Sequence, residues 1–195
     1  MTGILERRPI VIAIAGPNGA GKTTLYRSHL EPSGLRFVNA DELANRLQID
    51  AYRAAEAADA IRRLLVDSGE SFIFETVFSD PVGDKLEFLK DAERRGYTVV
   101  LFFVGIDSPA ASDERVSIRV AKGGHDVPRE KLASRYQRVM ENLRRALVEL
   151  SNIRVYDNSD MRAPHRLVAI RESGGPIQLY HPVPGWLKPL LPARR

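Results

Sequence analysis

The chain alternates short, wholly apolar runs with longer stretches in which apolar residues recur every three or four positions. The first apolar run, residues 10–15, is rich in isoleucine and is closed by Gly16 and Pro17. A run of this kind is typical of a strand that is buried on both faces of a parallel sheet. Similar runs predict four more strands, at residues 35–38, 71–74, 97–104 and 153–156.

Helical periodicity fills the intervals between these runs. Residues 51–66 carry alanine, isoleucine and leucine at helical spacing, and Gly69 follows as a stop signal. Residues 128–150 have an apolar stripe and begin with Pro128, which suits a first helical position. The pattern also predicts helices at 21–30, from Glu42, at 82–95, and at 112–121 with Ser112 or Asp113 as the N-cap.

Alternating strands and helices predict the α/β class, here a parallel sheet of five strands with helices on both faces. Two further short strands, 166–171 and 177–180, flank a Gly-Gly-Pro turn and predict a C-terminal β-hairpin. The tail from residue 181 holds four prolines and is expected to be irregular. We expect one domain over residues 1–195, with a lid at about 110–135 and the hairpin and tail at about 166–195.

Composition narrows the class of protein. The 195 residues are 44% hydrophobic and 28% charged, which argues against a disordered chain. The chain has no cysteine, so disulfides and thiolate metal sites are excluded. No apolar run approaches transmembrane length and the N-terminus does not resemble a signal peptide, so we expect a cytoplasmic protein without a membrane partner. A net charge of +4 suits an anionic ligand but is no nucleic-acid signature.

A complete P-loop pattern follows the first strand. Its glycines allow a tight turn whose backbone N–H groups point at a phosphate, and the helix that follows adds the positive end of its dipole. In this pattern Lys22 reaches the β- and γ-phosphates and the Thr23 hydroxyl binds Mg²⁺. The predicted nucleotide-binding residues of the loop are Gly16, Pro17, Asn18, Gly19, Ala20, Gly21, Lys22, Thr23 and Thr24.

Carboxylates follow two of the predicted strands, at the sheet edge where ligands bind in such folds. Asp41 could accept a proton from a substrate hydroxyl, or it could simply cap the helix that begins at Glu42. Glu75 could hold Mg²⁺ or grip a substrate hydroxyl, with the Thr76 hydroxyl beside it, or it could be a solvated strand end.

Basic residues gather around a Gly-Gly break in the predicted lid. Arg115 and Arg119 are four apart and therefore share a helix face. Such a segment could close over ATP and place an arginine on the transferring phosphate, or it could be a solvated basic face. His125 lies in the break itself, and four scattered histidines without cysteine argue against a zinc site.

Several of these segments together resemble the zeta-toxin-like P-loop kinases, in their compact bacterial branch that is often described as a predicted ABC-type ATPase. The resemblance covers roughly residues 9–172, and the segment 123–128 is far more specific to the family than the P-loop. The matching segments are residues 16–24, 37–42, 74–76, 119–128, 135–136 and 156–159.

This resemblance implies a kinase that uses ATP and Mg²⁺, and the best-known zeta toxins phosphorylate a sugar hydroxyl of UDP-N-acetylglucosamine. By position, Asp41 matches the family's proposed base, and Glu75 and Thr76 match its substrate-side pair. Arg119 and Arg135 resemble its phosphate-contacting arginines.

The resemblance also suggests that Asn158 meets the adenine, and we assign His125 to the substrate site. The chain is shorter than the toxins with an established sugar-nucleotide substrate, and it has no segment that matches their uridine-binding elaboration. Any antitoxin would be a separate protein. Two other readings stay open: an ATPase that acts as a switch or motor subunit, and a nucleic-acid end kinase, although no basic patch interleaved with aromatic residues supports the latter.

Overall fold

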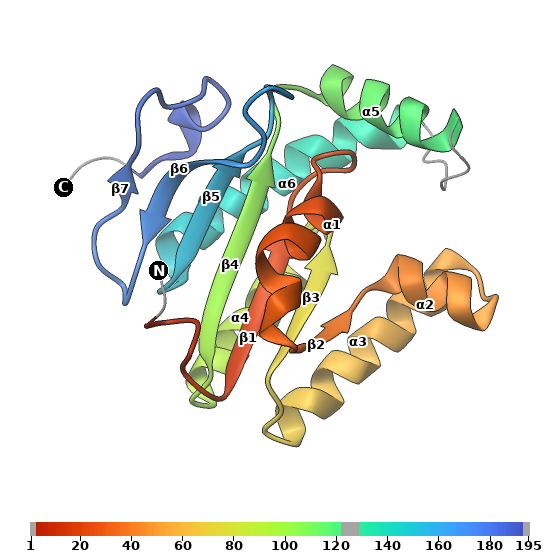
Figure 1. Cartoon of the computed structure of the whole chain (residues 1–195), viewed down its shortest axis with the longest axis vertical. Helices are drawn as coiled ribbons and strands as arrows, with labels where there is room; N and C mark the ends of the chain where they lie inside the picture. Colours follow the sequence, from red (N-terminus) through yellow and green to blue (C-terminus); the bar gives the residue numbers. More distant parts are fainter. Residues whose placement is uncertain (1–2, 122–128, 193–195) are drawn as a thin grey trace.

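A computed structural model describes residues 3–121 and 129–192, with the side chains of 118–121 and 129–132 left out. Seven strands form one sheet in the order β2-β3-β1-β4-β5-β6-β7 (Figure 1). They are β1 (Ile10–Ala15), β2 (Arg36–Val38), β3 (Phe72–Thr76), β4 (Thr98–Gly105), β5 (Ile153–Asp157), β6 (Arg166–Arg171) and β7 (Gln178–Leu179).

The first five strands in the sheet are parallel, which confirms the predicted α/β fold. β1 pairs with β3 on one side and with β4 on the other. The predicted C-terminal hairpin is also present, but it extends the same sheet, because β6 pairs antiparallel with β5. The chain leaves β1 toward β2 and leaves β4 toward β5, so the carboxyl end of β1 lies where the connections diverge, the usual ligand position in such sheets.

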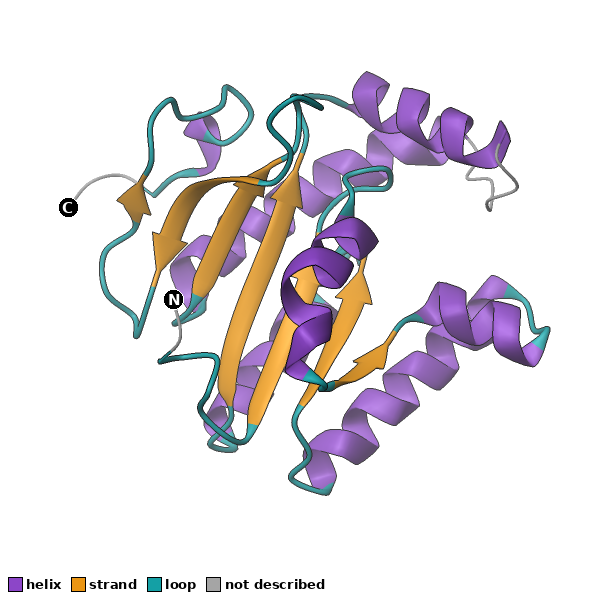
Figure 2. Cartoon of the chain, viewed as in Figure 1, coloured by secondary structure: helices purple, strands orange, loops and turns teal. Residues whose placement is uncertain are grey.

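Helices cover both faces of this sheet (Figures 1 and 2). The helix after the P-loop lies on the front face over β1, while α4 and α6 lie behind the sheet. The helical segments are α1 (Lys22–Leu25), which continues as η1 (Tyr26–Leu30) and η2 (Glu31–Ser33), then α2 (Ala40–Leu47), α3 (Ala51–Asp67), α4 (Asp84–Arg94), α5 (Pro109–Ala121), α6 (Arg129–Glu149) and η3 (Lys188–Leu190).

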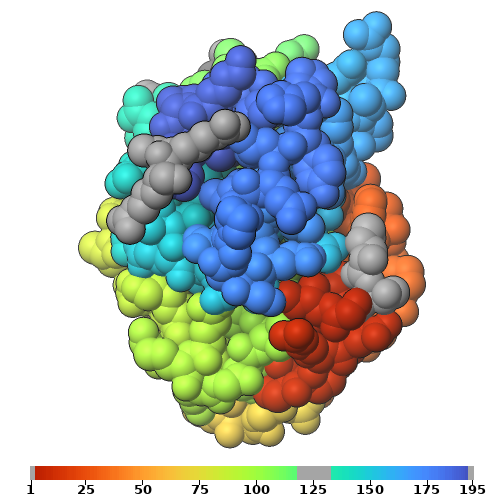
Figure 3. All heavy atoms as spheres, turned by 90° about the vertical axis from the view of Figure 1, so that its left-hand side faces the viewer, coloured from red at the N-terminus to blue at the C-terminus, as the bar shows by residue number. Residues whose placement is uncertain are grey.

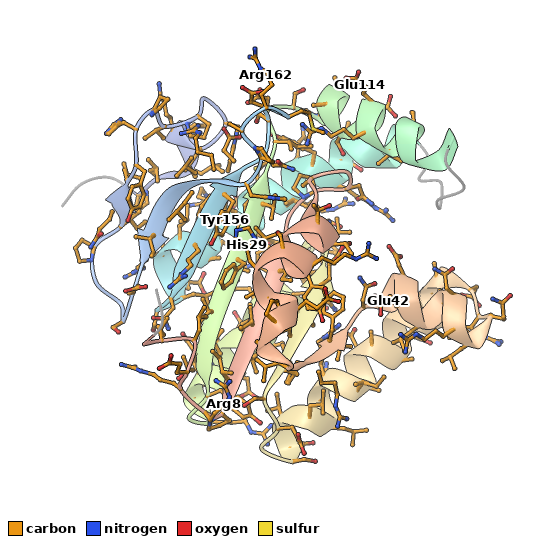
Figure 4. All side chains as sticks on the ribbon, in the orientation of Figure 1. Arg8, His29, Glu42, Glu114, Tyr156 and Arg162 are labelled. Carbon is orange, nitrogen blue, oxygen red and sulfur yellow. The ribbon has the colours of Figure 1, made fainter. Side chains whose placement is uncertain are left out.

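The core follows from the apolar runs that predicted the strands. Every side chain of β1 is buried, and so are those of β4 from Val99 to Val104. On the front face, His29 after the P-loop lies beside Tyr156 of β5, with ring centroids 6.4 Å apart (Figure 4). This contact joins the helix after the P-loop to β5.

Two boundaries differ from the predictions, and a third cannot be compared. Glu75 and Thr76 belong to β3 rather than following it. α5 begins at Pro109, so the prediction of Ser112 or Asp113 as its N-cap is wrong. Pro128 lies outside the described residues. Within the described part of the chain, no helix combines the length and apolar character needed to cross a membrane.

Candidate active site

The P-loop begins where β1 meets the end of β4. Gly16 has φ 146°, and a Cβ at this position would lie 2.1 Å from the Val104 carbonyl oxygen. Gly21 has φ 91°, and a Cβ there would lie 2.5 Å from the Asn158 amide nitrogen. Both positions therefore require glycine, because an added carbon would strain the backbone and collide with atoms that have little room to move.

Lys22 lies across the loop that precedes it. Its side chain is 7% exposed, and Nζ donates to the carbonyl oxygens of Gly16 and Pro17, each at 3.0 Å. Nζ is also 4.0 Å from Oε1 of Glu75. The ammonium group is thus held against the phosphate loop by two carbonyls of the loop itself.

Glu75 connects the P-loop with the start of α2. Its Oε2 accepts a hydrogen bond from the Thr23 hydroxyl at 2.8 Å and one from the Asn39 amide at 3.2 Å. The hydroxyl and carboxylate oxygens of Thr23 and Glu75 are the hard ligands that Mg²⁺ prefers. These two residues therefore suit the magnesium site predicted from the sequence.

Asn39, which sequence reasoning did not single out, caps α2. Its Oδ1 accepts from the backbone N–H groups of Asp41 at 2.8 Å and Glu42 at 3.3 Å. The alternative in which Asp41 is the helix cap is therefore wrong. The Asp41 side chain is exposed and lines the cavity beside the P-loop, so its carboxylate is available for another role.

This cavity has a volume of 260 Å³ and is bounded by the P-loop, α2, α3, the end of β3 and the start of α4. Lys22, Asp41, Glu75 and Thr76 all contribute to its wall. A larger groove of 390 Å³ between α3 and α4 does not touch the P-loop. The smaller cavity is therefore the better candidate for a site that receives a phosphoryl group.

Arg62, Asp80 and Lys85 also line this cavity, and Arg62 and Lys85 share the carboxylate of Asp59 as a partner. The Asp59 carboxylate pairs with Arg62 and accepts from Lys85 Nζ at 2.9 Å, and the Arg62 guanidinium lies 4.8 Å from the centre of the Phe74 ring. Burial lowers the pKa of Arg62 to about 10 and also lowers the pKa of Lys85, whereas it raises the pKa of Asp80. No local motif marks this cluster, because Lys85 of α4 reaches Asp59 of α3 only when the two helices pack.

Another set of side chains holds the P-loop from the side of β5. The Asn158 amide donates to the Ala20 carbonyl at 2.7 Å, and a ring nitrogen of His165 lies 3.1 Å from the Gly21 carbonyl. Burial is the main reason why the pKa of His165 lies below its usual value, so the ring is neutral near pH 7 and can donate from Nε2. Sequence reasoning placed Asn158 near the adenine; its amide here is bonded to the P-loop itself.

Helix α5 contacts the P-loop from above. The Ser112 hydroxyl donates to the Asn18 carbonyl at 2.6 Å, and Arg115 donates to the Ser159 carbonyl at 3.1 Å. Arg119 lies in the last turns of α5, but its side chain is outside the described residues, as is all of His125. Their predicted roles stay predictions, as does that of Arg135, which is half-buried on α6.

The P-loop at the centre of a 2-3-1-4-5 parallel sheet, with a cavity beside it, defines the fold of the P-loop kinases. Within that class, the chain belongs to the zeta toxin family, whose model matches residues 4–166. The family predicted from the sequence is therefore confirmed.

Solved structures agree with this fold. The complex of AvrRxo1-ORF1 with AvrRxo1-ORF2 has a TM-score of 0.70 and 18% identity, and the match covers 91% of this chain and 62% of that one. The same complex has also been solved with ATP. The PezAT toxin–antitoxin system of Streptococcus pneumoniae has a TM-score of 0.61 and 18% identity, covering 85% of this chain and 72% of that one.

One curated relative is a tRNA dimethylallyltransferase of Citrifermentans bemidjiense. It is 25% identical over an alignment 192 residues long, and the match covers 90% of this chain and 57% of the relative. The chain thus spans less than two thirds of the length of this enzyme and of the matched chain of the AvrRxo1 complex.

Proposed function

We propose that the protein is an ATP-dependent phosphotransferase that moves the γ-phosphoryl group of ATP to a hydroxyl of a small molecule. One observation carries this proposal: Asp41 is not used as a helix cap, and its exposed carboxylate lines the same cavity as Lys22 and Glu75. A carboxylate, a phosphate-binding lysine and a magnesium-type oxygen pair around one cavity are the parts that phosphoryl transfer needs.

The P-loop and Lys22 would bind the β- and γ-phosphates, since the motif is complete and the ammonium group of Lys22 already lies against the loop. Thr23 and Glu75 would hold Mg²⁺, which supplies charge neutralisation at the phosphate oxygens when bound. We expect Arg119 to neutralise charge that develops on the transferring group, and Arg135 to contact phosphate, in the manner of a closing lid.

Asp41 would orient the acceptor hydroxyl and take its proton. The hydroxyl oxygen forms a bond to the γ-phosphorus, the bond from that phosphorus to the bridging oxygen breaks, and ADP leaves. The proton passes to the Asp41 carboxylate. Asp41 is exposed and lines the cavity at the start of α2, where an acceptor hydroxyl could reach its carboxylate.

The wall of the cavity favours a polar acceptor. The carboxylates of Asp41 and Glu75 and the cationic groups of Arg62 and Lys85 all line it. The wall therefore offers both hydrogen-bond acceptors and donors. UDP-N-acetylglucosamine is the acceptor that we place first, with Glu75, Thr76 and His125 on the substrate side. The neighbouring PezAT system is a toxin–antitoxin pair, which supports a separate antitoxin protein as a partner of this chain.

Product mass spectrometry tests this proposal. The wild-type chain and its Asp41→Asn variant are incubated with ATP, Mg²⁺ and UDP-N-acetylglucosamine, and in parallel with a bacterial metabolite extract. We expect a phosphorylated product 80 Da heavier than its acceptor from the wild type, reduced at least about 100-fold in the variant because a general base is lost.

Glu42→Gln is the matched control, because Glu42 is the next carboxylate on α2 (Figure 4). Glu42 is not among the residues that line the cavity. This variant should make the product at the wild-type rate. ATP consumption without any phosphorylated metabolite would instead favour an ATPase. A product that forms equally well in Asp41→Asn would overturn the role of Asp41.

A further inference from the structure

The C-terminal segment from residue 180 folds back over the ends of β4 and β5, beyond the residues that the family model matches. Leu187 is fully buried and η3 packs against α6. Figure 3 shows this side of the molecule, where the C-terminal residues, in blue, cover much of the surface above the N-terminal residues, in red. A segment that was expected to be irregular is therefore fixed to the body of the protein.

Trp186 is the main contact of this segment. Its ring lies 6.1 Å from the ring of Phe103 and covers Gly105, where an added Cβ would lie 2.2 Å from the indole. The indole Nε1 donates to Oδ1 of Asp157 at 3.0 Å. The last residues of β4 therefore lie between two partners, because the carbonyl of Val104 also approaches the P-loop at Gly16.

Asp157, the last residue of β5, accepts four hydrogen bonds. Besides the indole, the Ser159 hydroxyl donates at 2.6 Å, the Ser159 N–H at 3.3 Å and the Arg166 guanidinium at 3.0 Å. Arg166 in turn donates to the carbonyl of Pro182 in the C-terminal segment at 2.7 Å. Burial opposes the charge of Asp157, but these hydrogen bonds outweigh it and hold the pKa of Asp157 below its usual value.

Asn158, the residue after Asp157, connects Asp157 with the phosphate loop through its own hydrogen bonds. Asn158 donates from its amide to the Ala20 carbonyl, and its Oδ1 accepts from the N–H of His165, whose ring reaches the Gly21 carbonyl. We infer that Trp186 is a positioning residue for phosphate binding: through Asp157 it fixes Asn158 and His165, which set the conformation of the P-loop. The inference rests on the proposed use of ATP and not on the identity of the acceptor.

The test measures binding of Mg-ATP and of Mg-tripolyphosphate by calorimetry, without any acceptor, in the full chain. Trp186→Phe keeps an aromatic ring over Gly105 but loses the N–H donor. We expect both ligands to bind about tenfold more weakly, equivalent to about 1.4 kcal/mol, because the P-loop itself is affected. Tyr180→Phe is the matched control, since it removes a polar atom from an exposed aromatic residue of the same segment and should leave both affinities unchanged.

A double-mutant cycle tests whether Trp186 acts through Asn158. If Trp186 acts through Asn158, the Trp186→Phe change should weaken binding less than about twofold in an Asn158→Ala background. A lower melting temperature with unchanged affinity would show a purely structural role and overturn the inference. Additive effects of Trp186→Phe and Asn158→Ala on affinity would also overturn the inference. The same holds if Trp186→Phe loses ATP binding but keeps tripolyphosphate binding. No binding by the wild type would overturn the proposed function itself, and the inference with it.

Discussion

The two sides of the P-loop are held by different chemistry. On the acceptor side, charged and polar side chains contact one another: Glu75 accepts from Thr23 and lies near Lys22. On the support side, the neutral side chains of Asn158 and His165 lie against backbone carbonyls of the loop. Groups on the acceptor side must exchange partners when phosphate and metal arrive, whereas the support side can keep its bonds throughout.

This difference separates groups that fix the geometry of the loop from groups that can act on the phosphate. A backbone carbonyl held by a neutral donor fixes the geometry of the loop without adding charge. An ammonium group held by carbonyls near a carboxylate is poised to move to a phosphate, which is a stronger partner. Substitutions on the acceptor side should therefore reduce the rate of phosphoryl transfer more than stability. Those on the support side should reduce stability or the affinity for phosphate more than the rate of phosphoryl transfer at saturating ATP.

The largest expected effect is that of Lys22→Met. Removing this cation should reduce the rate of phosphoryl transfer on the order of 10²–10³-fold, since it deletes a charge aimed at the reacting phosphate. The measurement is the rate of ADP release with the identified acceptor, with the surface variant Lys90→Met as the control. A Lys22→Met rate within threefold of the wild-type rate would contradict the claim that the acceptor side acts in phosphoryl transfer.

Glu75→Gln should act mainly through Mg²⁺. The variant keeps a side-chain oxygen that can accept from Thr23 but loses the negative charge, so the Mg²⁺ concentration at half-maximal activity should rise about 10- to 100-fold. The check is a Mg²⁺ titration at saturating ATP. An unchanged Mg²⁺ requirement would assign Glu75 to the substrate alone.

Ser112→Ala tests the support side, because Ser112 of α5, like Asn158, donates to a backbone carbonyl of the loop. The Ser112 hydroxyl is buried and donates to the Asn18 carbonyl, so its loss should lower the free energy of unfolding by about 1 kcal/mol. The rate of phosphoryl transfer should change less than about threefold. Chemical denaturation and initial rates on the same preparation measure both quantities. A large rate loss with unchanged stability would show that α5 acts in catalysis through Ser112.

The smallest expected effect is the contribution of His165 to the pH dependence of stability. Its folded pKa lies below the value of about 6.5 for the unfolded chain, mainly through burial. The unfolded state therefore binds a proton first, and stability is lost as pH falls from about 6.5 through the lower folded pKa. Denaturation between pH 5 and 8 should show a shallower slope in His165→Gln than in the wild type; equal slopes would contradict this contribution.

The elements that the sequence predicts well are those whose signal is local. The apolar run before Gly16 and the P-loop are contiguous, so β1 and the position of Lys22 follow from pattern alone. The sequence left open whether Asp41 caps α2 or acts as a base, because Asn39 and Asp41 both suit an N-cap and only the observed hydrogen bonds distinguish them.

Other parts of the site depend on packing between distant segments. Arg62 and Lys85 belong to different helices and meet at Asp59 only after α3 and α4 pack. Trp186 reaches Asp157 across 29 positions of the sequence, through a single hydrogen bond that no local pattern encodes. The sequence therefore predicted the phosphate loop, but neither the far wall of the cavity nor the support of the loop.

The central claim is that the carboxylate of Asp41 takes part in the reaction and does not stabilise α2. Initial rates and the free energy of unfolding, measured together for Asp41→Asn and Asn39→Ala, test it most directly. We expect Asp41→Asn to lose about 10²-fold or more in rate with unfolding changed by less than about 0.5 kcal/mol, and Asn39→Ala to lose about 1 kcal/mol of stability. An Asp41→Asn variant that keeps its rate, or that loses stability as Asn39→Ala does, would contradict the claim.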